Sequence, residues 1–104
     1  MTDQFDSVSV RKQANIYFDG KCVSHTVLFA DGSKKTLGVI FPSRLRFNTE
    51  AAEVMELLRG ACRIRRAGEA QWTNYQGGEK FEVAANSHFE IETTALLDYV
   101  CHFV

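Results

Sequence analysis

The sequence predicts an all-β domain, either a sandwich or a small barrel. Short apolar runs recur along the chain at roughly 8–12-residue spacing, which is typical of many short strands. The stretch Phe89-Glu90-Ile91-Glu92 alternates apolar and acidic residues, and this period of two places one side-chain face in a core. Asp31-Gly32 separates two such runs and is a strong hairpin signal, because glycine accepts the positive φ of a tight turn. These features together favour strands over helices.

The predicted strands follow one another from the N-terminus with turn residues between them. Asp19-Gly20 ends one run, and Asp31-Gly32 joins two others into a hairpin. The expected strands are residues 8–10, 14–18, 23–30, 35–41, 45–48, 62–66, 72–75, 80–84, 89–93 and 97–103. The stretch 49–59 differs, because local propensity favours a helix there, with Thr49 as its N-cap and Gly60 as its stop.

Length and charge indicate one globular domain. The chain has 104 residues, 45% of them hydrophobic, which suits a single core over 1–104. Residues 1–7 are polar and are expected to form a loose tail. Twelve basic residues stand against thirteen acidic ones, a net charge of −1. Nucleic-acid binding is therefore not expected, because neutralising phosphates needs a basic excess.

The sequence predicts a cytoplasmic location for the protein. Its N-terminus carries acids where a signal peptide has bases, and no apolar run reaches the roughly 18 residues of a membrane span. Cys22, Cys62 and Cys101 are odd in number and widely spaced, so they suggest reduced, buried thiols rather than a disulfide framework or a zinc site.

Six stretches of the chain, taken in order, carry a resemblance to a known family. They are Asn15-Ile-Tyr-Phe-Asp-Gly-Lys21, Thr26-Val-Leu-Phe-Ala-Asp-Gly-Ser33, Lys35-Thr-Leu-Gly-Val39, Gly77-Gly-Glu-Lys-Phe-Glu-Val83, Asn86-Ser-His-Phe89 and Asp98-Tyr-Val-Cys-His-Phe-Val104. In this ordered set the chain resembles the pyrimidine/purine nucleoside phosphorylase family of small cupins. The likeness covers nearly the whole chain, from Asn15 to Val104.

This resemblance implies a single small cupin barrel of the jelly-roll type, forming a homodimer. It implies phosphorolysis of purine and pyrimidine nucleosides to a free base and α-D-ribose 1-phosphate. Inorganic phosphate would be the co-substrate, with no other cofactor. The resemblance also reads residues 54–59 as a strand, and we follow it against the local helix propensity, because tertiary context overrides propensity.

Two stretches depart from the family pattern. Where the family has Pro-Gly-Glu-Tyr-Glu-Phe, this chain has Pro42-Ser-Arg-Leu-Arg-Phe47, so two acidic positions are basic. Where the family has Val-Pro-Ala-Asn-Ser, Ala84 replaces the proline. The metal-binding cupin pair His-x-His falls on Arg44-Leu45-Arg46, and a further histidine position falls on Phe89. Since arginine cannot replace a neutral imidazole ligand, no metal is predicted.

The candidate site residues each have a structural alternative. Arg44 and Arg46 lie two apart on one strand face, either as a phosphate clamp or as solvated side chains beside buried Leu45. Glu53 is a candidate for stabilising the ribosyl cation, or else an edge residue in solvent.

The remaining candidates would contact the base. His88 could protonate the leaving base and Asn86 could bind it, or both could lie in an exposed turn. Tyr99 could stack on the base or belong to the core. The sequence thus leaves three functions open: a phosphorylase, a non-catalytic cupin that binds a small anion or nucleotide, and a structural dimer that presents an interaction surface.

Overall fold

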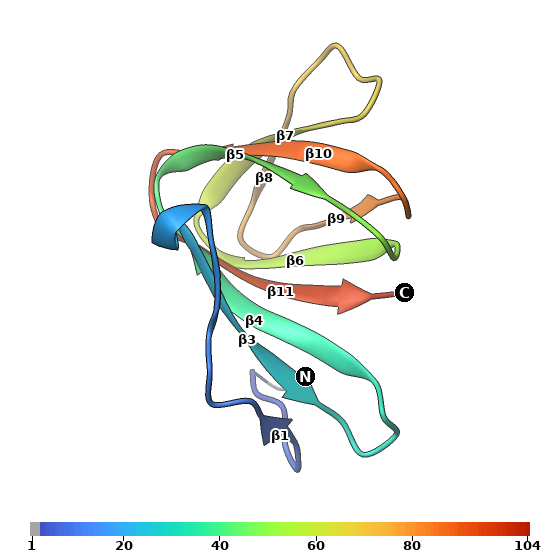
Figure 1. Ribbon diagram of the computed structural model, residues 1–104. Helices are drawn as coiled ribbons and strands as arrows, with labels where there is room; N and C mark the ends of the chain where they lie inside the picture. The colour runs from blue at the N-terminus through green and yellow to red at the C-terminus, as the bar shows by residue number, and fades with distance from the viewer. Residues whose placement is uncertain (1–2) are drawn as a thin grey trace.

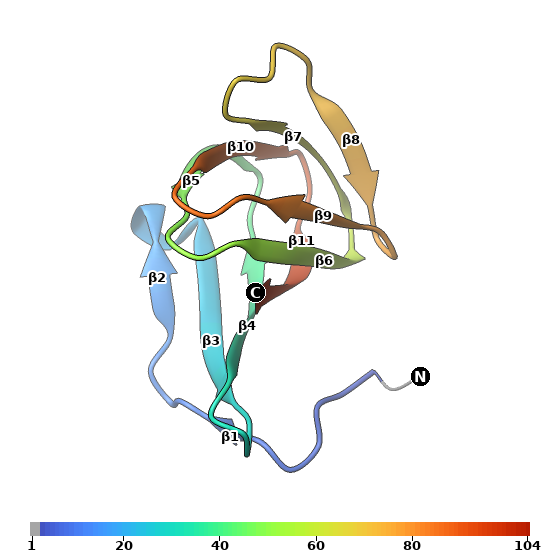
Figure 2. The same ribbon diagram turned by 90° about the vertical axis from the view of Figure 1, so that its right-hand side faces the viewer.

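The computed structural model describes residues 3–104 as two antiparallel sheets that face each other (Figures 1 and 2). Within these residues the large sheet has seven strands and the small sheet has four. The large sheet contains β1 (Ser9–Val10), β2 (Asn15–Tyr17), β3 (Cys22–Leu28), β4 (Lys34–Ile40), β6 (Glu53–Arg59), β9 (Lys80–Val83) and β11 (Leu97–Phe103). The small sheet contains β5 (Ser43–Asn48), β7 (Ala61–Arg66), β8 (Thr73–Gln76) and β10 (His88–Thr93).

The strand order places distant parts of the chain side by side. In the large sheet the order is β1-β3-β4-β11-β6-β9, with β2 pairing on β3, and in the small sheet it is β5-β10-β7-β8. The C-terminal strand β11 therefore lies between β4 and β6 at the centre of the large sheet. The last strand thus pairs with one strand from the first half of the chain and one from its middle.

Within the described residues the chain passes between the two sheets six times, because from β4 onward only β7 and β8 are consecutive strands of the same sheet. Gly60 forms the junction from β6 to β7 with a φ of 100°, a value that favours glycine. A Cβ atom there would lie 2.6 Å from the carbonyl oxygen of Leu96. The glycine that the sequence offered as a helix stop is thus the corner between two strands.

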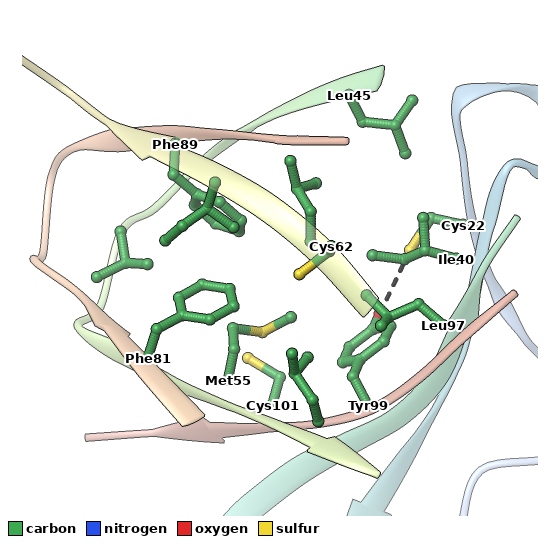
Figure 3. Packing of buried hydrophobic residues seen from close by; sticks show 14 residues of the cluster. Cys22, Ile40, Leu45, Met55, Cys62, Phe81, Phe89, Leu97, Tyr99 and Cys101 are labelled. Atoms are coloured by element: carbon green, nitrogen blue, oxygen red, sulfur yellow. Dashed lines mark hydrogen bonds between the residues drawn. The ribbon is translucent and has the colours of Figure 1, made fainter. Parts of the chain in front are cut away.

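The core fills the space between the sheets (Figure 3). Phe89 and Ile91 of β10 and Ile64 of β7 point inward from the small sheet, and all three are at most 2% exposed. Met55 and Leu57 of β6 meet them from the large sheet. The alternation seen in the sequence thus places one face of each sheet in the core.

The all-β prediction is confirmed, and so is the strand at residues 54–59. The local helix propensity is overridden there because β6 forms hydrogen bonds with a strand on each side, β11 and β9. A helix would remove Met55 and Leu57 from the core. The barrel is not closed, however, since the two sheets do not join by hydrogen bonds into one ring.

Two further expectations can be placed on the structure. Part of the tail, residues 1–2, lies outside the described residues, and Phe5 packs edge-on against Phe29 with ring centres 5.2 Å apart. The three cysteines are free and buried, as predicted. No helix within residues 3–104 is long and apolar enough to cross a membrane.

Candidate active site between the two sheets

A small cavity, here called the interior pocket, lies between the sheets where β5 and β10 face β3, β4, β6 and β11. Its volume is about 160 Å³. The pocket is lined by Tyr17, Ser24, Thr36, Ile40, Phe47, Asn48, Glu53, Met55, Phe89, Tyr99, Cys101 and Phe103. Small-molecule sites usually measure about 300–1,000 Å³, so a ligand as large as a nucleoside would extend through the mouth of this pocket.

Aromatic rings form the wall on the side of the small sheet. Phe47 and Phe89 are stacked, with ring centres 5.5 Å apart and planes 20° apart. The rings of Tyr17 and Phe18 meet Phe47 edge-on at 6.4 and 5.2 Å. Tyr17 is 46% exposed and Phe103 is 37% exposed, so these two side chains lie at the rim. The wall offers a flat ligand aromatic surfaces without any particular hydrogen-bond pattern.

Tyr99 lies on the opposite side, at the floor of the pocket. Its ring is buried and its Oη lies 3.3 Å from Sγ of Cys22, as the dashed line in Figure 3 shows. Burial, followed by the nearby Cys22 thiol, raises the pKa of Tyr99 far above its usual range. Tyr99 is therefore a neutral phenol that can donate or accept a hydrogen bond.

The floor at Tyr99 depends on Gly38 of β4. A Cβ atom on this glycine would lie 2.8 Å from the Tyr99 Oη and 2.7 Å from the carbonyl oxygen of Val23. Such distances are too short for any side chain, so glycine is needed for the close approach of Tyr99 to β3 and β4.

Glu53 is the carboxyl group of the pocket, at the start of β6. Burial raises its pKa, and a hydrogen bond with the Cys101 thiol opposes this rise. Burial, with the charge of Glu53 as the next cause, raises the pKa of Cys101 to about 12, so the thiol stays protonated. A carboxylate in this partly desolvated place interacts with a ligand charge more strongly than it would in water.

The lining of the interior pocket is poor in positive charge. Of the described residues, no Arg, Lys or His lines it. Its polar groups other than Glu53 are neutral, and they include the hydroxyls of Ser24, Thr36 and Tyr99. The electrostatic character of the pocket is therefore set by Glu53, which favours a ligand atom that develops positive charge.

The structure places Arg44 and Arg46 away from the interior pocket. Both are exposed on the outer face of β5, while Leu45 between them is buried. This is the solvated alternative that the sequence left open. The two arginines and Glu53 therefore do not share one cavity.

His88 and Asn86 also lie apart from the pocket. His88 begins β10, and its neighbour Phe89 points into the core, so His88 belongs to the outer face of the small sheet. Asn86 occupies an exposed turn with a φ of 53°, where its N–H donates to the carbonyl oxygen of Glu50 at 3.2 Å. Of the six predicted site residues, the structure brings Glu53 and Tyr99 together.

Several lining residues were not among the predicted site residues. They include Tyr17, Ser24, Thr36, Phe47, Cys101 and Phe103. Part of this set has a sequence signal, because a period of two from Tyr99 places Cys101 and Phe103 on the same strand face. The contributions from β2, β3 and β4 depend on how the sheets face each other.

Comparison with another hollow helps to choose this cavity as the site. A wider hollow of about 410 Å³ lies beside β7 and β8, lined by residues such as Cys62, Asn74 and Gln76. It is more open to solvent than the interior pocket, which lies between the two sheets and holds a partly buried carboxyl group. Within residues 3–104, no three His, Cys, Asp or Glu side chains gather as a metal-ion site.

The two facing antiparallel sheets around an interior pocket have the fold of cupin proteins. Bacillus subtilis oxalate decarboxylase OxdC, a cupin protein, shows this likeness with a TM-score of 0.68, at 17% identity over 86% of this chain and 27% of that one. A protein of unknown function from Acinetobacter sp. ADP1 is closer, with a TM-score of 0.95 and 50% identity over 97% of this chain and 98% of that one.

The family follows from the sequence comparisons. The family model for pyrimidine/purine nucleoside phosphorylase matches residues 12–103. The pyrimidine/purine nucleoside phosphorylase of Herminiimonas arsenicoxydans is 71% identical over all of both chains. The chain belongs to the pyrimidine/purine nucleoside phosphorylase family.

Proposed function

We propose that this chain is a nucleoside phosphorylase that uses the interior pocket as its active site. It would transfer the pentosyl group of purine and pyrimidine nucleosides to inorganic phosphate, giving a free base and α-D-ribose 1-phosphate. Family membership over residues 12–103 supports the activity. The observation that carries the site is the carboxyl group of Glu53, partly buried in a pocket that also has an aromatic wall.

Glu53 acts on the charge that develops during the reaction. A phosphate oxygen forms a bond to the anomeric carbon while the bond to the base nitrogen breaks. The electron pair of that bond leaves with the base, which takes up the proton that phosphate gives up. The sugar ring is transiently cationic, and a carboxylate beside it stabilises that charge more than it stabilises the neutral substrate.

The aromatic wall accounts for a broad choice of base. Phe47 and Tyr17 offer ring surfaces on which purines and pyrimidines can both stack, and buried Phe89 is stacked against Phe47. Stacking discriminates little between bases, because every base has an aromatic face. The exposed rim at Tyr17 and Phe103 leaves room for the base outside the small cavity, with the sugar toward Glu53.

Phosphate would be held by neutral donors rather than by arginine. The hydroxyls of Ser24, Thr36 and Tyr99 line the pocket opposite the aromatic wall, and Tyr99 is kept neutral by its environment. The roles first considered for Arg44, Arg46, His88 and Asn86 are not part of this site. Inorganic phosphate is the co-substrate, and we assign no cofactor. We expect the protein to be cytoplasmic and to form a homodimer. Sedimentation of the purified protein would test the dimer.

The decisive experiment measures phosphorolysis of uridine and adenosine by the wild type and by Glu53→Gln. Removing one preorganised electrostatic group usually costs about 10²–10³-fold in turnover, and we expect a loss of that size with a KM much less affected. Glu50→Gln, in the exposed turn that precedes β6, is the matched control and should keep full activity. Full activity of Glu53→Gln would show that the site lies elsewhere.

The second candidate is a non-catalytic cupin that binds a small anion or nucleotide. It is favoured by the basic residues Arg44 and Arg46 at positions where the family pattern has acidic ones. The same assay separates the two functions. Release of free base by the wild type excludes the binding protein, and no release across a panel of nucleosides excludes the phosphorylase.

A further inference from the structure

The outer face of the small sheet carries an ordered group of charged side chains, here called the arginine face. Its members point away from the core because their neighbours along each strand point into it. They are Arg44 and Arg46 of β5, Glu90 and Glu92 of β10, and Arg63 and Arg65 of β7. The central strand β10 thus holds the acids, and the strands on both sides hold the arginines.

The strand register arranges these groups in two rows. Glu90 lies opposite Arg46 on one side and opposite Arg65 on the other. Glu92 lies in the same way between Arg44 and Arg63. Each carboxylate therefore has an arginine on either side, and four guanidinium groups surround two carboxylates.

Ion pairs hold part of this arrangement in place. Arg65 Nη2 lies 2.7 Å from Glu90 Oε1, and Arg63 Nε lies 2.7 Å from Glu92 Oε1. Arg44 is farther from Glu90, at 3.7 Å, and its side chain is 52% exposed. The arginines of β7 are thus bound to the acids of β10, whereas those of β5 are more open to solvent.

Trp72 covers this face from the loop between β7 and β8, which projects beyond the small sheet (Figure 2). The guanidinium carbons of Arg63, Arg65 and Arg44 lie 4.5, 4.8 and 5.0 Å from its ring centre. Contacts between a cation and an aromatic ring at these distances are attractive and restrict the arginine side chains. These three arginines are therefore ordered before any ligand arrives.

The arginine face has two more positive than negative charges. The excess is visible at Glu90, whose pKa is lowered by its hydrogen bond with Arg65 and by the charges of Arg65, Arg44 and Arg46. A guanidinium group offers a planar fork of N–H donors that fits the oxygens of a phosphate. An excess of two charges matches a compact dianion.

We propose that the arginine face binds a small phosphate-bearing anion, either inorganic phosphate or a phosphate monoester. A long polyanion such as a nucleic acid is disfavoured, because the whole chain has a net charge of −1 and would repel it beyond this face. The site is separate from the interior pocket, because it lies on the opposite face of the small sheet. The proposal therefore does not rest on the proposed function.

The chain supplies its own probe of this face, since Trp72 is its single tryptophan. Inorganic phosphate, uridine 5′-monophosphate and uridine are each titrated into the wild type at constant ionic strength, and tryptophan fluorescence is recorded. We expect saturable changes with phosphate or with the monophosphate, and none with uridine. Comparing the two affinities tells whether free phosphate or a phosphate ester is the preferred ligand.

Arg46→Ala is the test variant, because Arg46 does not contact the reporter Trp72. A charge-assisted hydrogen bond contributes about 1.5–3 kcal/mol, so we expect affinity to fall by roughly 10-fold or more. Arg46→Lys keeps the positive charge but loses the planar fork of N–H donors, so its affinity for phosphate should lie between those of the wild type and Arg46→Ala. Arg59→Ala, whose side chain pairs with Asp98 on the large sheet, is the matched control and should bind as the wild type does.

Clear outcomes would overturn the proposal. These are a fluorescence change equally large with uridine or with sodium chloride, an unchanged affinity in Arg46→Ala, or a much tighter complex with a single-stranded oligonucleotide. Glu53→Gln should bind phosphate at this face like the wild type, even if it has lost turnover. The two sites can thus fail or succeed independently.

Discussion

The two faces of the small sheet are built from the same strands and have opposite character. On the inner face Leu45, Ile64 and Ile91 are at most 6% exposed and contact the core. One residue further along each strand, the side chain is a charged group in contact with solvent. A step of one residue along a strand therefore decides whether a group meets the low dielectric of the core or the high dielectric of water.

This contrast extends to two glutamates with different environments. Glu53 begins β6 and lines the interior pocket, and burial raises its pKa. Glu90 lies on the arginine face, and its arginine neighbours lower its pKa. The same side chain is thus made harder to ionise by burial in one region and easier to ionise by positive neighbours in the other, and those positive neighbours also favour a bound anion.

The largest effect is expected at Phe89 of β10, and its neighbour Glu90 on the other face of the same strand is the comparison. Phe89→Ala empties a site that is 2% exposed and removes the ring stacked on Phe47, and such changes cost about 3–5 kcal/mol. Glu90→Ala removes the ion pairs with Arg65 and Arg44 at the sheet surface, where such pairs contribute little, so we expect a much smaller loss. Urea unfolding of both variants measures the difference, and equal losses would contradict the two-face description.

A smaller effect is expected at Gly38, beneath the pocket floor. Gly38→Ala brings a methyl group to 2.8 Å from the Tyr99 Oη, so Tyr99 or β3 must shift. Overpacking of this kind costs about 1–3 kcal/mol. The temperature of thermal unfolding and the rate of phosphorolysis should both be lower than in the wild type. Gly32→Ala, at a hairpin turn with open space around it, is a useful comparison, since any loss there comes only from its φ of 88° and should leave activity unchanged.

The fold could largely be predicted because each strand carries its own signal. Alternation in Phe89-Glu90-Ile91-Glu92 and the turn at Asp31-Gly32 are local patterns, and both gave elements that the structure contains. Local propensity alone would have failed at residues 53–59, where Glu, Met and Leu favour a helix. Pairing with β9 and β11 decides that segment, and those partners are distant in sequence.

The site could be predicted only in part, for a different reason. Glu53 and Tyr99 were both predicted, and both line the interior pocket. Which face of β5 points into the core, however, depends on how the two sheets pack against each other. The spacing of Arg44 and Arg46 showed that they share a face, without showing that it is the outer one. The rim residues Tyr17 and Phe103 meet at the pocket from opposite ends of the chain, so no local motif reveals them.

The smallest effect, and the sharpest test of the contrast, is the pH dependence of stability in Glu53→Gln and Glu90→Gln. At Glu53 the folded pKa is raised from 4.5, so the native state binds more protons than the unfolded state as the pH rises above 4.5. The wild type therefore loses stability between 4.5 and the folded pKa. Glu53→Gln should be more stable than the wild type at neutral pH, with the difference vanishing below 4.5.

Glu90 should give the opposite sign. Its folded pKa lies below 4.5, so its contribution is fully present above 4.5 and is lost as the pH falls through the folded pKa. Glu90→Gln should therefore be less stable than the wild type at neutral pH and should match it in strong acid. Urea unfolding from about pH 3 to about pH 8 measures both differences, and adding salt should shrink the Glu90 difference more, because exposed charges are screened more than buried ones. Differences of the same sign would mean that the two glutamates do not occupy the contrasting environments on which both proposed sites depend.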